Sequence, residues 1–266
     1  MAIFGNVLPK FMCKSLNLQQ TLLPVSRFIS LFRKKSKEES HYLIHRPQPD
    51  EYCEILRLLW ECYYPEEPTT LSLGLGHCHN PVMDEDSLRG LSEGLSLVAR
   101  CKYTGDIVAG SVNRTACPWD AEEMERFSCS LTCPKLKSYT KFNAHLLKAP
   151  MLWERFCTDK IFEISQVFVK KEERQKGLGF KLIKSSKELG ADCGFRVIRL
   201  DATSHYSAKI CEKLDMRLIY TINYDDYVDI YGNPVIKPPP PHCACKVYID
   251  LPHSMEQRKK KKKKRK

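Results

Sequence analysis

The chain of 266 residues is 42% hydrophobic and 28% charged, a balance that predicts one sizeable globular core and excludes a disordered or fibrous protein. Its formal net charge of +11 comes from the two ends, because residues 1–37 hold seven basic residues and residues 259–266 hold eight. The rest of the chain has 28 basic against 32 acidic side chains. This part of the chain is mildly acidic and has no excess of basic residues that would bind nucleic acid. We therefore expect an activity that does not require nucleic acid.

Thirteen cysteines, an odd number, are scattered along the chain, which is unlike the paired framework of a small secreted domain and predicts reduced thiols. No group has the paired C-x-x-C spacing typical of structural zinc, so we expect no metal site. The longest apolar stretches fall short of the ~20 residues that span a bilayer, so we expect no transmembrane segment. The closest metal-type groupings are His77-Cys78-His79, Cys129 with Cys133, and Cys243 with Cys245.

Composition divides the chain into three parts. Residues 1–38 form a basic extension that resembles a transit peptide or a disordered segment. Residues 253–266 form a polybasic tail with nothing to bury, and residues 39–252 form the predicted domain. We expect a cytoplasmic protein, with the mitochondrion as the alternative from the first segment and the nucleus as the alternative from the last.

Between the ends, hydrophobic periodicity predicts strands and helices in alternation. A helix over residues 50–64 ends at Pro65, and Thr104-Gly105-Asp106 joins two strands as a hairpin turn. This order predicts an α/β or α+β fold, with a mixed central sheet flanked by helices. The predicted elements in chain order are a helix at 50–64, strands at 95–101, 107–113 and 161–169, a helix at 178–189, a strand at 195–200, a helix at 204–214, and strands at 217–224 and 245–251.

The segment Arg174-Gln175-Lys176-Gly177-Leu178-Gly179 lies between a predicted strand and a predicted helix. Its two glycines let the backbone approach a ligand, and the N–H groups of a helix N-terminus favour a pyrophosphate. A third glycine at the dinucleotide spacing is missing, and so is the G-K-[ST] of a P-loop. The segment therefore indicates either a nucleotide-containing ligand other than NAD or ATP, or a tight strand-to-helix turn.

This R-x-x-G-x-G segment resembles the acetyl-CoA signature of the GNAT (Gcn5-related) N-acetyltransferases. The segments at 91–99, 201–209, 223–227 and 237–242 resemble the insect-type arylalkylamine (dopamine) N-acetyltransferases, and the resemblance spans residues 41–251. It implies the GNAT fold with splayed parallel strands. It also implies a monomer that acetylates dopamine, octopamine, tyramine or serotonin from acetyl-CoA by direct transfer in a ternary complex. One departure is Asp215, which stands where the family usually has glycine.

The chemistry needs a base, because an alkylamine with a pKa near ~10.4 arrives as an unreactive ammonium. Glu67, which precedes Pro68, matches the catalytic glutamate of the resembled family; a solvated loop carboxylate is the alternative. Thr203 and Ser207 match hydroxyls that face the reaction centre, and Ser207 or Tyr206 would protonate the leaving thiolate.

The alternative roles of these hydroxyl residues are helix capping by Thr203 or Ser204 and packing by Tyr206. Cys211 is expected to be a packing residue. Tyr63 and Tyr64 are expected to select the amine, together with residues 141–156 and 161–169. The residues implied to bind acetyl-CoA are Gln166, Val167, Phe168, Val169, Arg174, Gln175, Lys176, Gly177, Leu178, Gly179 and Lys181.

Two other functions remain open from the sequence. The first keeps the fold and changes the chemistry to polyamine or protein-lysine acceptors, or to long-chain acyl-CoA donors. The second is a non-catalytic binding module that acts through its basic tail.

Overall fold

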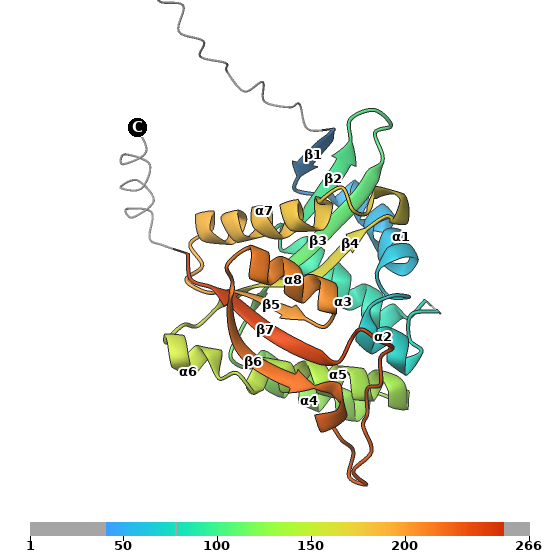
Figure 1. Ribbon diagram of the computed structural model, residues 1–266, viewed down its shortest axis with the longest axis vertical. Coiled ribbons are helices and arrows are strands. Elements are labelled where there is room, and N and C mark those ends of the chain that lie inside the picture. Colours follow the sequence, from blue (N-terminus) through green and yellow to red (C-terminus); the bar gives the residue numbers. More distant parts are fainter. Residues whose placement is uncertain (1–40, 78, 253–266) are drawn as a thin grey trace, which may run out of the picture. The chain divides into compact units, whose positions relative to one another are not determined.

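The computed structural model describes residues 41–77 and 79–252, so the predicted segments 1–38 and 253–266 lie outside the described residues. The described part folds around one sheet (Figure 1). Its helices are η1 (Pro49–Glu51), α1 (Tyr52–Cys62), α2 (Pro68–Leu73), α3 (Pro81–Ser92), α4 (Asp120–Ser130), α5 (Pro134–Lys148), α6 (Leu152–Phe156), η2 (Lys171–Glu173), α7 (Leu178–Asp192), α8 (His205–Lys213) and η3 (Tyr224–Asp226).

The sheet has seven strands in the order β1-β2-β3-β4-β5-β7-β6. Five neighbouring pairs are antiparallel, and β4–β5 is parallel. The expected mixed sheet flanked by helices is therefore confirmed. The strands are β1 (Tyr42–His45), β2 (Leu97–Cys101), β3 (Ile107–Ala116), β4 (Ile161–Val169), β5 (Ile198–Ala202), β6 (Arg217–Asn223) and β7 (Ala244–Asp250).

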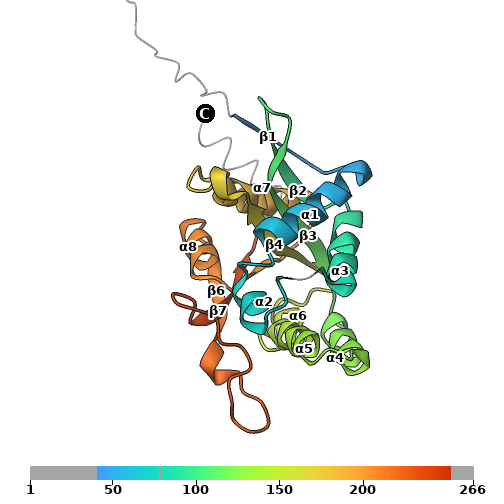
Figure 2. The same cartoon turned by 90° about the vertical axis from the view of Figure 1, so that its right-hand side faces the viewer.

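Helices cover both faces of this sheet (Figure 2). On one face, α7 packs on β2, β3 and β4, and α8 packs on β5 and β7. On the other face, α1 buries Ile55, Leu58 and Leu59 against Val112 and Phe168 of the sheet. The predicted apolar stripe of α1 is thus its core face, and the alternating side chains of β4 reach both layers.

The two parallel strands separate partway along their length. Pairing between β4 and β5 covers residues 162–164, where Ile164 lies opposite Leu200. Beyond that point β4 remains paired with β3, while β5 continues beside β7. Among the described residues, no strand pairs with the β5-facing edge of residues 166–169. This is the splayed arrangement that the family resemblance implied.

Several predicted boundaries are corrected. The strand predicted at 195–200 lies at Ile198–Ala202, because Phe195 stays in the preceding turn and packs edge-on against Phe162 at a centroid distance of 5.3 Å. The strand predicted at 107–113 continues to Ala116. Helices α2 to α6 and strand β1 were not predicted. None of the described helices is both long and apolar enough to cross a membrane.

Candidate active site

Glu67 caps the N-terminus of α2 instead of lying in a solvated loop. Pro68 occupies the first helical position, where its fixed φ favours helix initiation. The backbone N–H groups of Thr69 and Thr70 donate to the Glu67 carboxylate at 3.1 and 2.8 Å, and Thr69 Oγ1 donates at 2.5 Å. The residue is 6% exposed. Three donors therefore hold a buried carboxylate in one orientation.

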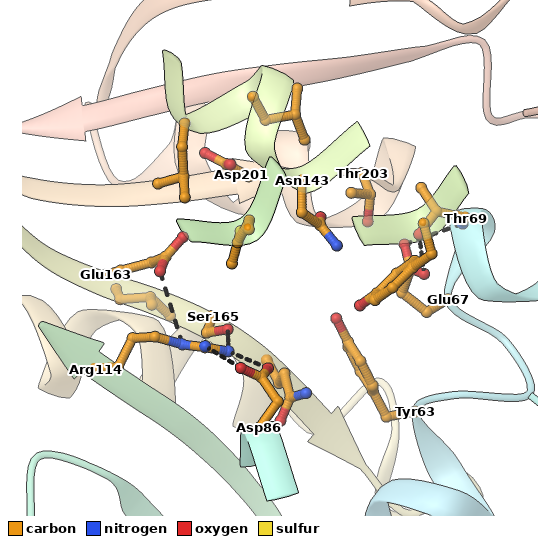
Figure 3. Close-up of a pocket in the computed structure, with 16 residues that line it drawn as sticks. Tyr63, Glu67, Thr69, Asp86, Arg114, Asn143, Glu163, Ser165, Asp201 and Thr203 are labelled. Carbon is orange, nitrogen blue, oxygen red and sulfur yellow. Dashed lines mark hydrogen bonds and ion pairs between the residues drawn. The ribbon is translucent and has the colours of Figure 1, made fainter. Parts of the chain in front are cut away.

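This carboxylate lines a cavity of about 70 Å³ (Figure 3). The walls come from the loop after α1, from helices α2, α3, α4 and α5, and from strands β3, β4 and β5. The side chains of Tyr63 and Asn143 point into it from opposite walls. The lining residues are Tyr63, Glu67, Thr69, Asp86, Arg114, Met124, Tyr139, Asn143, Leu146, Leu147, Glu163, Ile164, Ser165, Gln166, Asp201 and Thr203.

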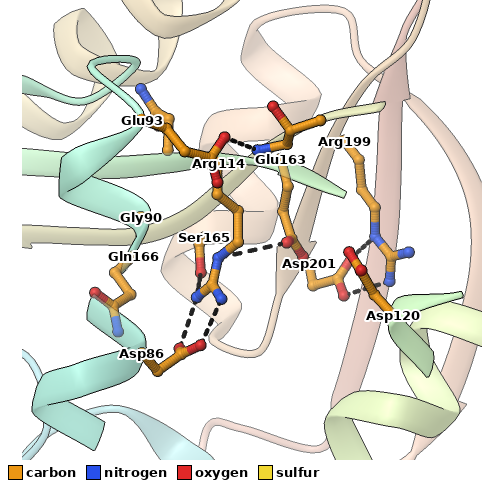
Figure 4. Close-up of polar contacts among 12 residues, drawn as sticks. Asp86, Gly90, Glu93, Arg114, Asp120, Glu163, Ser165, Gln166, Arg199 and Asp201 are labelled. Carbon is orange, nitrogen blue, oxygen red and sulfur yellow. Dashed lines mark hydrogen bonds and ion pairs between the residues drawn. The ribbon is translucent and has the colours of Figure 1, made fainter. Parts of the chain in front are cut away.

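The cavity lining is acidic: among the described residues that form it, four carry carboxylates and one, Arg114, is basic. Arg114 donates to both oxygens of Asp86 at 2.7 and 2.8 Å (Figure 4). Burial alone would raise the pKa of Asp86, but the Arg114 guanidinium outweighs it and holds that pKa below its ordinary value. Asp201 also accepts two hydrogen bonds from an arginine, Arg199, at 2.8 and 2.6 Å.

Two tyrosine hydroxyls border the cavity beside Glu67. Burial raises the pKa of both Tyr63 and Tyr139 well above the ordinary phenol value, and the nearby Glu67 charge adds to the rise. Both phenols therefore stay protonated at neutral pH. Tyr64, which was also expected to select the amine, is hydrogen-bonded to Ser87 and Gln166 and lines a neighbouring cavity.

The predicted hydroxyl residues lie around the first turn of α8. Thr203 precedes the helix and lines the cavity with Glu67. Ser204 is the N-cap and forms a capping box with Ser207, whose Oγ lies 2.9 Å from Ser204 Oγ. Tyr206 is 63% exposed and packs edge-on against His242 at a centroid distance of 5.8 Å. The structure thus brings Thr203 to Glu67, whereas Ser207 and Tyr206 are outside the cavity lining.

The glycine segment between β4 and α7 has left-handed backbone at two positions. Gln175 has φ 63°, and Gly177 has φ 77° as the N-cap of α7. A Cβ built on Gly177 meets no atom within 4 Å, whereas one on Gly179 would lie 3.5 Å from Ile210 Cδ1. The N-terminus of α7 is therefore open at Gly177, and Leu178 anchors it from the core.

The basic side chains of this segment already have partners. Arg174 Nε donates to the carbonyl of Val169 at 3.2 Å. Lys176 pairs with Glu173 at 2.9 Å, and Lys181 lies 6.0 Å from the ring centroid of Tyr42. The basic side chains around the N-terminus of α7 are therefore held by contacts within the protein, and two of them lie near Tyr42 or its partner Glu173.

Residues 166–169 contribute side chains to the core and backbone to the open edge. Gln166 and Phe168 are buried at 4% and 2% exposure, while Val167 and Val169 pack toward α7. The Gln166 amide donates to Tyr64 Oη at 3.0 Å and accepts from Ser87 at 3.2 Å. Any ligand contact from these four residues on the open edge is thus a backbone contact.

The sequence did not identify the carboxylates that share the cavity with Glu67. Asp86, Glu163 and Asp201 come from α3, β4 and β5. The available signal was Glu163, the single charged residue in a strand whose other polar residues, Ser165 and Gln166, are uncharged. Among the described residues, no group of three or more histidine, cysteine or acidic side chains is placed to hold a metal ion.

Residues 52–215, more than half of the chain, match the acetyltransferase (GNAT) family. Arylalkylamine N-acetyltransferase 2 from Aedes aegypti is 28% identical, with a TM-score of 0.75 over 80% of this chain and 99% of that one. A mosquito arylalkylamine N-acetyltransferase-like 5b is 26% identical, with a TM-score of 0.75 over 79% of this chain and 100% of that one.

A Drosophila melanogaster polyamine N-acetyltransferase, described as forming N-acetylagmatine, is also 26% identical. Its TM-score is 0.71, and the match covers 79% of this chain and 100% of that one. The family match agrees with the splayed β4–β5 pair and the glycine segment between β4 and α7. The chain belongs to the GNAT acetyltransferase family.

Proposed function

We propose that this chain transfers the acetyl group of acetyl-CoA to a small primary amine, with Glu67 as the general base. The observation that carries the proposal is the setting of Glu67, a buried carboxylate on a cavity whose floor includes β4. The same strand leads from that cavity to the glycine segment and has an unpaired edge on the way. An acceptor and a donor therefore have separate sites that meet along β4.

The residues at the open edge fit the donor. Acetyl-CoA, when bound, supplies the acetyl thioester. Residues 166–169 offer an unpaired strand edge for its amides. Gln175, Gly177 and Gly179 provide a backbone concavity at a helix N-terminus for its pyrophosphate. Arg174, Lys176 and Lys181 add positive charge around the N-terminus of α7.

The acceptor needs to lose a proton before it reacts. Because an alkylammonium has a pKa near ~10.4, a carboxylate fixed beside it is required to take the proton, directly or through one water molecule. Glu67 is held by Thr69 and Thr70 with its charge facing the cavity. Thr203, on the same cavity, would orient the amine by accepting or donating one hydrogen bond.

The leaving sulfur needs a proton in return. Ser207 and Tyr206 carry hydroxyls on the first turn of α8, and we propose either of them as the donor. Cys211 has no such role, since it is fully buried and burial raises the pKa of its thiol to about 12. This supports direct transfer over an acyl-cysteine route.

Two acceptor classes are supported by different observations. Small arylalkylamines such as dopamine, octopamine, tyramine or serotonin are supported by the mosquito relatives and by Tyr63 and Tyr139 in the cavity. Agmatine or a polyamine is supported by the Drosophila relative and by the four carboxylates of the lining. A monomer in the cytoplasm remains our prediction for the state and location of the protein.

The test is turnover of an amine panel with acetyl-CoA by wild type and Glu67→Gln. Glutamine keeps the size and an acceptor oxygen for the α2 cap but removes the base, so turnover should fall by about 10²- to 10⁴-fold. Calorimetric titration should show unchanged acetyl-CoA affinity. Glu122→Gln, the same substitution at an exposed position on α4, is the matched control and should retain full activity.

Near-normal turnover by Glu67→Gln would exclude Glu67 as the base. Absence of turnover by wild type with every amine, together with absence of acetyl-CoA binding, would refute the enzyme assignment and favour a binding module.

A further inference from the structure

The four carboxylates that line the cavity differ in their cationic partners. Two of its carboxylates, Asp86 and Asp201, each accept two hydrogen bonds from an arginine, Arg114 and Arg199 respectively. Glu67 is held by neutral donors and has no arginine or lysine partner among the described residues. With these two hydrogen-bonded arginine pairs set aside, two carboxylates of the cavity accept no hydrogen bond from a described arginine or lysine, and Glu163 is the second.

Glu163 has a weak contact with its nearest cationic neighbour. Its Oε2 lies 3.7 Å from Arg114 Nε, which is beyond hydrogen-bond distance, and no described residue donates a hydrogen bond to it. The Glu163 side chain is 16% exposed. Burial acts to raise its pKa, and this outweighs the opposing charges of Arg114 and Arg199. A charged Glu163 therefore lacks the partners that buried carboxylates normally have.

A second observation concerns the other side of this contact, the Nε–H group of Arg114. Arg114 is 9% exposed, its Nε is buried, and Nε has no hydrogen-bond acceptor among the described residues. Its other nitrogens are bound by Asp86 and Ser165. The Glu163 carboxylate thus makes no hydrogen bond with the Arg114 Nε–H group. It lines the cavity, and Figure 3 shows it on the opposite side from Glu67.

We propose that Glu163 is a specificity-determining residue that binds the second cationic group of a dicationic acceptor, a diamine or an aminoguanidine, whose reacting amine lies at Glu67. This inference rests on the proposed amine acetylation and deepens it. Two carboxylates that accept no hydrogen bond from a cationic group, at two sides of one cavity, match two cationic groups on one ligand. A monoamine would pair with Glu67 and leave Glu163 without a hydrogen-bonded cation.

The cavity has an acidic neighbour on the side formed by α3, α4 and α5. A neighbouring cavity of about 370 Å³ between α3, α4 and α5 shares four of its lining residues. It is also acidic, because Glu85, Asp120 and Glu123 line it against one described basic residue, Arg89. An acidic lining of this kind raises the local concentration of cations. The residues common to both cavities are Asp86, Met124, Tyr139 and Asn143.

The experiment compares acceptors that differ in the second charge alone. Putrescine and agmatine are measured against butylamine, which has the same four-carbon chain, with wild type and Glu163→Gln. The wild-type enzyme should prefer the dications in kcat/KM. Glu163→Gln should lose about 10- to 100-fold of that preference, the usual effect of removing a charged hydrogen-bond partner. Butylamine turnover should change little, and Glu122→Gln should behave as wild type.

Equal losses for butylamine and putrescine in Glu163→Gln would overturn the inference, since they would indicate a structural role. An unchanged dication preference would overturn it as well, as would a wild type that prefers phenolic monoamines such as tyramine over every dication. These results leave amine acetylation intact. A wild type that acetylates no amine would instead refute the proposed function itself.

Discussion

Glu66 Oε2 lies 2.6 Å from the Arg174 guanidinium, and this ion pair joins the loop that carries Glu67 to the segment that carries Gly177. Lys171 is a second partner of Glu66, at 3.2 Å. Partial burial acts to raise the pKa of Glu66, but the hydrogen bonds from Arg174 and Lys171 outweigh it and keep that pKa below its ordinary value. The proposed base and the proposed pyrophosphate site are thus mechanically connected through adjacent residues.

Glu66→Gln should lower turnover by up to about fivefold. The pair is 37% exposed on both sides, and such an ion pair contributes up to about 1 kcal/mol, which corresponds to that factor in rate. The loss should appear because the α1–α2 loop is held less firmly against the glycine segment. Steady-state kinetics with saturating amine and varied acetyl-CoA is the measurement.

Glu67→Gln is the comparison for this variant, since its expected loss is at least twenty times larger, about 10²-fold or more. A Glu66→Gln enzyme as inactive as Glu67→Gln would contradict the division of roles between the two neighbours. Glu66 is consequently unsuitable as an inert control for Glu67, although its sequence position suggests one.

Gly177→Val should abolish acetyl-CoA binding measured by calorimetric titration. Valine is strained at φ 77° and adds its side chain to the open space at the α7 N-terminus. The chain offers a matched control in Gly105, which has φ 78° and also has no atom within 4 Å of a built Cβ. Gly105→Val in the β2–β3 turn should lose similar stability and keep acetyl-CoA affinity.

Parallel loss of affinity in both glycine variants would show that strain alone is responsible. Wild-type affinity in Gly177→Val would remove this segment from the donor site.

Asp215→Gly should stabilise the protein by about 0.5–1 kcal/mol in urea unfolding. Asp215 closes α8 in a Schellman motif, with its N–H donating to Glu212 O at 3.1 Å and that of Met216 to Cys211 O at 3.0 Å. The motif requires a left-handed residue, and Asp215 has φ 53°, which glycine adopts without strain. The substitution also removes a negative charge from the negative end of the helix dipole.

Lys209→Gly, at an exposed position inside the same helix, is the control with the opposite sign and should destabilise the protein by about 1 kcal/mol. A loss of stability in Asp215→Gly would show that the aspartate has compensating contacts. The departure from the family pattern at this position is therefore accommodated by the local backbone at a small energetic cost.

The sequence predicted the elements whose periodicity is strong. The run of apolar, β-branched and aromatic residues over 161–169 identified β4 to the residue, and the spacing of Ile55 and Leu59 identified α1. Helices α2, α3 and α5 were missed because their apolar patterns are short or mixed. Each begins with a proline at the first helical position, and α2 and α3 also have a capping side chain before it. The sequence signal for a helix N-terminus was therefore present, but no periodic apolar segment followed to support it.

Only one part of the candidate site could be predicted from the sequence. Glu67 and the glycine segment were identified because each has a local sequence pattern. Asp86, Arg114 and Glu163 were not, because they meet through the register of β3 with β4, in which Arg114 is paired with Glu163, and through the packing of α3 on β3. Contacts between residues so far apart along the chain leave no short-range pattern.

The preference for dications should weaken as the pH falls. Burial places the pKa of Glu163 above its ordinary value, against the lowering effect of Arg114 and Arg199 and with a further raising effect from Asp201 and Asp86. Glu163 therefore takes up a proton at a pH above the usual carboxylate range near ~4.3. Protonation removes the negative charge that binds the second cation, so preference is present above this pKa and is lost as the pH drops through it.

The measurement is the ratio of kcat/KM for putrescine to that for butylamine at each pH. The ionisation of Glu67 affects the rates with both acceptors, so its effect cancels in the ratio. Both acceptors remain fully cationic because alkylamines titrate near ~10.4. In wild type the ratio should fall toward that of Glu163→Gln at acidic pH, while the variant's ratio should stay flat. A wild-type ratio that is constant with pH, or one that changes equally in the variant, would show that another group controls the preference.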